Sequence, residues 1–400
     1  MGRFYESLLI DKEEMKPYFC LLSHVENIGN ATYQRLQERF DSPKDLFVQK
    51  EQVIKDTNIL SMGQFEALMR VRSMYGKDAR GYYDALAKRK IGFVSLEEED
   101  YPQRLKDIPD RPIGLFYMGK LPDDMKPSAG VIGARECSFY GEEAAGLIGE
   151  SLGENGIAVI SGMARGIDSL AQIAAVDAGG ESFAILGGGA DICYPKESIK
   201  LYERLKSEGG IISEYPPGTR PEKTHFIRRN RLISGLSNVL CVVEAKKKSG
   251  TLITVDCALE QGRDVFAVPG RITDRTAAGC NELIRQGAEI LSDPKLLAED
   301  ILMRYGVYET KGKECRKNEV RAEQKLSYME ETILRLITED SFVPEDLLSF
   351  EAMQSYGNAY EILTACMVLS YAGFLVNMGG GRFRISKKGA SYRNMFLQVP

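Results

Sequence analysis

The sequence of 400 residues is poor in the side chains from which metal and redox sites are built. Histidine occurs only twice, at His24 and His225, and none of the eight cysteines forms a CxxC pair, the closest two being Cys241 and Cys257. These spacings exclude a zinc ribbon and a dithiol redox pair as predictions, and a disulfide framework is not expected in a chain of this length. We therefore predict no metal site and thiols that stay unpaired.

Long apolar runs and a surplus of positive charge are also lacking. No apolar run approaches the roughly 18 residues of a membrane span, and the N-terminal segment MGRFYESLLIDKEEMK has no apolar stretch followed by a cleavage site. Because the net charge is −5, the protein as a whole does not attract nucleic acid or an acidic membrane surface. We expect a cytoplasmic protein that contacts no membrane and that would hold a polyanion only through a local basic patch.

Composition divides the chain into five predicted parts. Residues 1–96 favour a small helical domain of the helix-hairpin-helix or SAM-like kind, in which Gly29 lies in an apolar-Gly-polar hairpin that either offers N–H groups to a phosphate or only packs. Residues 97–128 are rich in proline and predict an extended connection. More than half of the 39 glycines lie within the core predicted at 129–305. A charged linker at 306–326 then leads to helices and a hairpin at 327–390, in the order of a winged helix.

The core alternates short apolar runs with amphipathic segments. This pattern favours an α/β fold with a Rossmann-like parallel sheet and helices on both faces. Runs that are apolar throughout, such as 239–243, indicate strands that are buried on both sides. The predicted strands are residues 131–134, 157–161, 182–186, 211–214, 239–244 and 265–268.

Glycine-rich loops follow most of these predicted strands. In open parallel sheets, ligands bind beyond the carboxyl ends of the strands, where N–H groups at helix starts can hold phosphate oxygens. The alternative is that these glycines only make tight turns. The loop residues that we predict to bind nucleic acid are Gly133, Arg135, Ser161, Gly162, Arg165, Gly187, Gly188, Lys248, Ser249, Gly250 and Thr251.

A basic strip adds to these loops. Between residues 220 and 231 there are five basic residues and one acidic residue, and three lysines occupy 246–248. Phosphate-binding loops, an arginine strip and aromatic rings together favour single-stranded nucleic acid. Ion pairing within the fold is the alternative for the arginines, and a solvated loop is the alternative for the lysines. The strip residues that we predict to contact the ligand are Phe226, Arg228, Arg229, Asn230 and Arg231.

Fingerprints of familiar nucleotide enzymes are missing. Gly133, Arg135 and Gly141 do not form GxGxxG, and there is no GxxxxGK[ST], so no cofactor is predicted. Four acidic residues lie at or just after strand ends, where a pair could act as acid and base, although caps or ion pairs are the favoured interpretation. These residues are Asp168, Asp191, Glu214 and Glu244. We predict no catalytic residue.

The motifs together resemble those of the DNA-processing protein A family (DprA/Smf) over nearly the whole chain. Matching elements are GxR followed by YG (Gly133, Arg135, Tyr140, Gly141), SGxARGID (161–168), LGxGxDxxYP (186–195), Phe226 with RNR (229–231), SGT (249–251), VPG (268–270) and GxNxLI (279–284). Two departures are Gln172, where many members carry His, and Ile227, where they carry Pro.

This resemblance implies an extended Rossmann-like core that binds single-stranded DNA without cutting it. It also implies a homodimer that protects incoming DNA and helps to load RecA onto it during natural transformation and recombination, and a C-terminal winged helix. The competing interpretations are a Rossmann-type nucleotide enzyme that resembles the lysine-decarboxylase-like phosphoribohydrolases, and an interaction scaffold. The first competitor typically shows PGGxGT, whereas this chain has KKKSGTLITVD.

Overall fold

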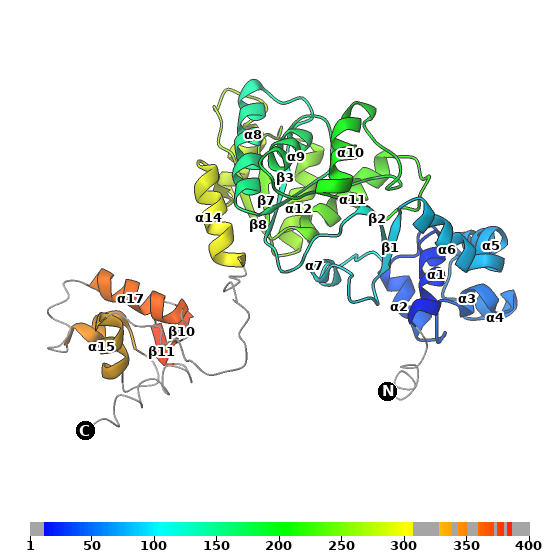
Figure 1. The fold of residues 1–400 in the computed structure, drawn as a ribbon, viewed down its shortest axis with the longest axis horizontal. Coiled ribbons are helices and arrows are strands. Elements are labelled where there is room, and N and C mark those ends of the chain that lie inside the picture. The colour runs from blue at the N-terminus through cyan, green and yellow to red at the C-terminus, as the bar shows by residue number, and fades with distance from the viewer. Residues whose placement is uncertain are drawn as a thin grey trace. The chain divides into compact units, whose positions relative to one another are not determined.

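A computed structural model describes residues 12–306, 328–337, 342–349, 359–371, 374–379 and 382–385 (Figure 1). The chain divides into two compact units, Met1–Glu309 and Thr310–Pro400. The first unit is built on a nine-stranded, mostly parallel sheet, which confirms the predicted α/β class. None of the described helices combines the length and the apolar character needed to cross a membrane.

The sheet has the strand order β1-β2-β6-β5-β4-β3-β7-β8-β9. All strands from β6 to β9 in this order pair in parallel, and β1 and β2 add an antiparallel edge. The chain order runs one way from β3 to β6 and then resumes with β7 on the other side of β3, so the order reverses between β3 and β7. The strands are β1 (Gly92–Ser95), β2 (Gly114–Gly119), β3 (Ser128–Ile132), β4 (Ala158–Ser161), β5 (Ser182–Ile185), β6 (Gly209–Ser213), β7 (Val239–Val242), β8 (Asp264–Ala267) and β9 (Glu289–Ile290).

Strands β3 to β8 overlap the six predicted strands. The proline-rich segment at 97–128, however, is not only the extended connection that the sequence predicts. It forms the short helix α7 (Gln103–Lys106) and strand β2, whose six residues contain no proline and pair with β6. The prolines at 109, 112 and 122 flank β2 rather than interrupt it, so they exclude a long helix but not a strand. The two-residue edge strand β9 is too short for a sequence pattern to predict.

Two apolar layers cover the two faces of the sheet. Alternate residues of a strand point to opposite sides, so Leu240 and Val242 join one core cluster while Val239 and Cys241 join the other. On the second face, α8 (Phe139–Glu154) and α9 (Ile167–Asp177) pack closely because Gly149 has no side chain. A Cβ at this position would lie only 2.3 Å from the Ala171 carbonyl oxygen. The remaining helices of this sheet region are α10 (Ile199–Glu208), α11 (Lys223–Leu236), α12 (Gly250–Glu260), α13 (Ala278–Arg285) and α14 (Pro294–Tyr305).

The N-terminal helices share a core with the antiparallel edge of the sheet. Phe19, Leu22 and Leu68 belong to the same apolar cluster as Phe93 of β1 and Phe116 of β2. Strand β1 therefore joins this helical region to the sheet. The helices are α1 (Lys12–Leu22), α2 (Asn30–Gln37), α3 (Asp45–Val48), α4 (Glu51–Asp56), α5 (Met62–Tyr75) and α6 (Ala79–Lys88).

The second unit has its own small core. Helices α15 (Tyr328–Leu336) and α17 (Ala359–Tyr371) pack with the 3₁₀ turn η4 (Pro344–Ser349) and the hairpin β10 (Leu375–Gly379) and β11 (Arg382–Ile385). Phe342 bridges to Phe383, and Ile333, Ile362 and Leu369 are fully buried around that contact. Within the region where the sequence predicts helices, residues Pro344–Ser349 thus form a 3₁₀ turn. The predicted linker at 306–326 lies outside the described residues apart from Gly306.

Candidate nucleic-acid interface

The loops after β3, β4, β5 and β7 meet at one end of the sheet, and we call residues 133–138, 162–166, 186–190 and 243–249 the carboxyl edge. Thr251 Oγ1 donates a hydrogen bond to the Gly133 carbonyl oxygen at 3.2 Å, and the Ile167 N–H donates to the Ala134 carbonyl oxygen at 3.3 Å. The loop after β3 therefore contacts both neighbouring loops. This is the point where the strand order reverses, which is where open α/β sheets bind ligands.

Phe226 is the centre of an aromatic and cationic cluster at this edge. Its ring lies 5.4 Å from the Tyr194 ring, and the guanidinium carbons of Arg135 and Arg229 lie 5.7 and 5.9 Å from its centroid. The ring packs against Gly187, where a Cβ would come within 2.8 Å of Phe226 Cδ1. Arg135 and Tyr194 are exposed. The cluster thus offers a cation and a π surface to solvent.

Arg229 lies beneath this cluster and is only 4% exposed. Its Nη1 donates to the carbonyl oxygens of Gly162, at 3.0 Å, and of Ile185. Burial lowers the pKa of the Arg229 guanidinium to about 10, and Asp168 opposes that shift. Burial also raises the pKa of Asp168, against the effect of Arg229, while the Gly162 N–H donates to the Asp168 carboxylate. Arg229 therefore joins α11 to the loops after β4 and β5 instead of facing solvent.

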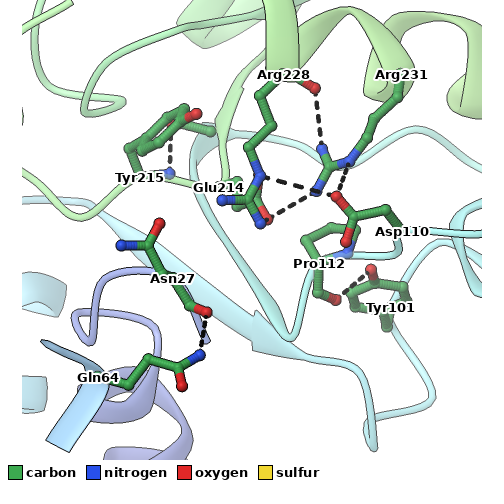
Figure 2. A network of polar contacts seen from close by, with 10 residues as sticks. Asn27, Gln64, Tyr101, Asp110, Pro112, Glu214, Tyr215, Arg228 and Arg231 are labelled. Carbon is green, nitrogen blue, oxygen red and sulfur yellow. Dashed lines mark hydrogen bonds and ion pairs between the residues drawn. The ribbon is translucent and has the colours of Figure 1, made fainter. Parts of the chain in front are cut away.

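Arg231 is likewise held inside the fold (Figure 2). It donates to Glu214 at 2.8 Å and to Asp110 at 3.1 Å, and it is only 8% exposed. Arg228 is half-buried and lies 3.7 Å from Glu214 and 3.8 Å from Asp110. Internal ion pairing, which the sequence left open as an alternative, therefore describes Arg231. The signal that sequence reasoning missed was the acidic partner Asp110, which is 121 residues away.

A family model for DNA recombination-mediator protein A matches residues 92–302, which is more than half of the chain and spans the whole nine-stranded sheet. The chain belongs to this family. The match begins at the first residue of β1 and ends within α14, so the family fold includes the antiparallel edge that the sequence did not predict.

Relatives of the recombination-mediator family support the same assignment. DNA processing protein DprA of Streptococcus pneumoniae is 42% identical over 53% of this chain and 75% of its own length. Protein Smf of Escherichia coli is 34% identical over 74% of this chain and 77% of its own length. The X-ray structure of the Streptococcus pneumoniae protein superimposes with a TM-score of 0.59 and 31% identity, covering 72% of this chain and 98% of that one.

The other predicted residues of this family member divide into exposed and buried sets. Arg165, Lys248 and Gly250 are exposed, while Gly133, Asn230, Ser249 and Thr251 are partly buried. Ser161, Gly162, Gly187 and Gly188 are buried. Ser161 Oγ donates to the Val131 carbonyl oxygen, and the Gly188 carbonyl oxygen accepts from Ser213 Oγ. The buried set shapes the loops, and the exposed set faces solvent.

Three helices begin at this edge without a side-chain cap. The N-cap residues of α9, α11 and α12 are Gly166, Glu222 and Ser249, and none of them supplies a side chain that accepts a hydrogen bond from its helix. In addition, Ser249 Oγ and Arg229 Nε are buried without a hydrogen-bond partner. Helix N-termini carry partial positive charge and unsatisfied N–H donors, so this edge is suited to an anion.

The four acidic residues considered for acid–base chemistry are all engaged in the fold. Glu244 accepts from Ser138 N and Oγ at 2.9 and 2.7 Å, and Asp191 accepts from Arg89 and from the Gly218 N–H. Asp168 and Glu214 are paired as described above. These contacts favour pairing within the fold over acid–base chemistry: Asp191 and Glu214 form ion pairs, and Asp168 and Glu244 accept from loop N–H groups. Among the described residues, no group of His, Cys, Asp and Glu is placed to hold a metal ion.

Gln172, one of the two departures from the family pattern, supports the loop after β4. Met163 in that loop has a φ of 52°, a left-handed conformation that side chains other than glycine seldom adopt. The buried Gln172 accepts from the Met163 N–H at 3.1 Å and donates to Ser182 Oγ at 3.1 Å. The glutamine thus fixes this strained turn. Ile227, the second departure, is 45% exposed on α11.

Proposed function

We propose that this member of the DNA recombination-mediator protein A family binds single-stranded DNA along the carboxyl edge and does not cleave it. The observation that carries the proposal is the exposed Arg135 beside the Phe226 and Tyr194 rings, next to three uncapped helix N-termini. Cations and N–H groups hold phosphates, and every base can stack on an aromatic ring. A single strand exposes its bases for this contact, whereas a duplex does not.

The predicted residues have different roles in this proposal. Arg135, Arg165 and Lys248 neutralise phosphates, and the backbone N–H groups of the loop glycines and of the SGT turn hold their oxygens. Phe226 stacks on a base, and Arg228 with Asn230 extends the contact along α11. Arg229 and Arg231 hold α11 in place. The loops are held in place by the buried residues Ser161, Gly162, Gly187 and Gly188. The residues that contact the DNA are Gly133, Arg135, Arg165, Phe226, Arg228, Asn230, Lys248, Ser249, Gly250 and Thr251.

The name of the family supports a wider role as a recombination mediator. In that role the protein acts as a homodimer in the cytoplasm, protects incoming single strands during natural transformation, and delivers them to RecA. The N-terminal helices form a domain of the helix-hairpin-helix or SAM-like kind, and the order helix, turn, helix and hairpin in the second unit supports a winged helix. Exchange of DNA-bound single-strand binding protein for RecA, with and without this chain, tests the delivery step.

Fluorescence anisotropy of a labelled dT oligonucleotide across a salt series tests the binding itself. Affinity should exceed that for a matched duplex and should fall steeply with salt, because bound cations release counterions. Arg135→Ala should reduce the slope of log K against log salt by about 0.7, the value for one phosphate of a single strand. Arg80→Ala is the control, because Arg80 is also exposed but lies in helix α6, paired with Asp84. Binding that ignores salt, or an Arg135→Ala slope equal to that of Arg80→Ala, would refute the proposal.

A further inference from the structure

Phe139 is an exposed aromatic residue that the proposed site does not use. Its side chain is 81% exposed, the highest value for any aromatic residue in the described part of the chain. It is the first residue of α8 and follows Arg135 by four positions on the loop after β3. The ring contributes little to the apolar core, so its conformation serves no evident packing role.

The backbone that carries Phe139 is held on both sides. Ser138 caps α8 by accepting a hydrogen bond from the Gly141 N–H at 3.1 Å, and its own N–H and hydroxyl bind Glu244. Tyr140 OH donates to the Pro269 carbonyl oxygen at 3.0 Å, which anchors the next residue to the loop after β8. An apolar ring is thus presented to water from a fixed position, a geometry that reduces the entropy lost when a ligand stacks on it.

Phe139 lies on a loop that is bonded to a second loop carrying exposed cations. Glu244, which binds Ser138, precedes the exposed lysines at 246–248 by two residues, and Arg135 lies on the same loop as Phe139. Phe139 is therefore an exposed ring on one of the two loops that carry the exposed cations and that meet at the Ser138–Glu244 contact. Stacking on such a ring suits a nucleobase whose phosphates are bound by nearby cations. A second copy of the chain would need roughly 1,000 Å² of contact, far more than one ring supplies.

We propose that Phe139 is a second base-stacking residue, and that a bound strand continues from Phe226 past Arg135 to Phe139. This inference rests on the proposed function and lengthens its binding path. The ligand is a single strand of any sequence, because each base presents a π face to the ring. A strand that reaches only Phe226 does not use the added contact.

The absence of tryptophan from the sequence allows a direct test. In a Phe139→Trp variant the only indole of the protein lies at the proposed contact, so a dT 20-mer should quench its fluorescence on binding. Leu147→Trp is the matched control, because Leu147 lies on the same helix and is 50% exposed. Phe139→Ala should weaken binding of the 20-mer by roughly five-fold or more, from the ~1–3 kcal/mol of one stacked base. The salt slope should not change, because no charge is removed.

The outcomes separate the two proposals. Failure of the wild-type protein to bind the 20-mer defeats the proposed function itself. In a second outcome, the wild type binds the 20-mer and Phe226→Ala weakens this binding, but Phe139→Ala keeps the wild-type affinity and Phe139→Trp shows no quenching. That outcome overturns only the role of Phe139. A Phe139→Ala variant with unchanged DNA affinity but an altered sedimentation coefficient also overturns it, in favour of contact between copies. Thermal unfolding of each variant shows that it is folded, which is expected because Phe139 is exposed.

Discussion

Replacement of Arg231 by methionine should destabilise the fold without removing a DNA contact. Methionine keeps the apolar stem of Arg231 but leaves Glu214, whose side chain is only 16% exposed, without its 2.8 Å partner. Removal of one partner from a buried ion pair typically costs ~3–5 kcal/mol. We expect about 3 kcal/mol, because Arg228 remains 3.7 Å from Glu214 and the second partner, Asp110, is half-exposed (Figure 2).

That loss converts into a measurable change of melting temperature. An unfolding entropy of ~2.1 cal/mol/K per residue, over roughly 300 residues in the first unit, gives a decrease of about 5 °C. Scanning calorimetry measures it on the larger transition, since the two units need not unfold together. Arg228→Met is the matched control, because its ion pairs are longer and more exposed, and it should cost less than about 1 kcal/mol.

The DNA-binding assay completes the test of Arg231. At a temperature where Arg231→Met is folded, its salt slope for a dT oligonucleotide should match the wild-type slope, whereas Arg135→Ala should lose about 0.7. An unchanged melting temperature together with a reduced salt slope would show that Arg231 contacts phosphate. That result would refute the assignment of Arg231 to the interior of the fold.

Three further variants test other contacts. Burial lowers the pKa of His24 from 6.5 to about 4, so the unfolded protein binds this proton more readily than the folded protein. About 3 kcal/mol of stability should therefore be present above pH 6.5 and lost as the pH falls towards 4. His24→Gln should flatten the decrease of melting temperature between pH 6.5 and 4, and a pH profile equal to that of the wild type would contradict this assignment. Gly149→Ala should lower stability by ~1–3 kcal/mol through its clash with the Ala171 carbonyl oxygen, whereas Gly146→Ala, with open space around it, should be neutral or stabilising in the same calorimetric scan. Gln172→Leu should leave the buried Met163 N–H without a partner, at a cost of ~1–3 kcal/mol of stability. Hydrogen exchange of the Met163 amide should then be faster than in the wild type. Equal exchange rates would show that the loop does not depend on Gln172.

The sequence was most informative where a local pattern determines structure. Continuous apolar runs gave the strands buried on both faces, and glycine with a following helix gave the loops at the carboxyl edge. The antiparallel strand β2 was missed because five prolines surround it, and proline density reports the absence of long helices rather than the absence of strands. Pairing of β2 with β6 depends on residues almost one hundred positions apart, which no local pattern contains.

The arginine strip shows why residue type alone cannot assign a binding site. Arg228, Arg229 and Arg231 are neighbours in the sequence, but the turn of α11 directs them to different surroundings. Arg229 meets backbone carbonyl oxygens, Arg231 meets two carboxylates, and Arg228 remains half-exposed. The burial of each guanidinium was therefore decided by segments far away, at 107–112, 162 and 185.

This division of roles has a consequence for the proposed binding of a polyanion by an acidic protein. The buried arginines and their partners neutralise one another and hold α11 against the loops, so they add little to the field outside the protein. The exposed cations at Arg135, Arg165 and 246–248 lie on adjacent loops at one end of the sheet, beside three helix N-termini. Since the whole chain carries a net charge of −5, attraction of a single strand must come from this concentration of charge, and screening by salt should act on these few contacts alone. A salt slope that corresponds to a few phosphates, rather than to the many basic residues of the chain, is the behaviour that this arrangement requires.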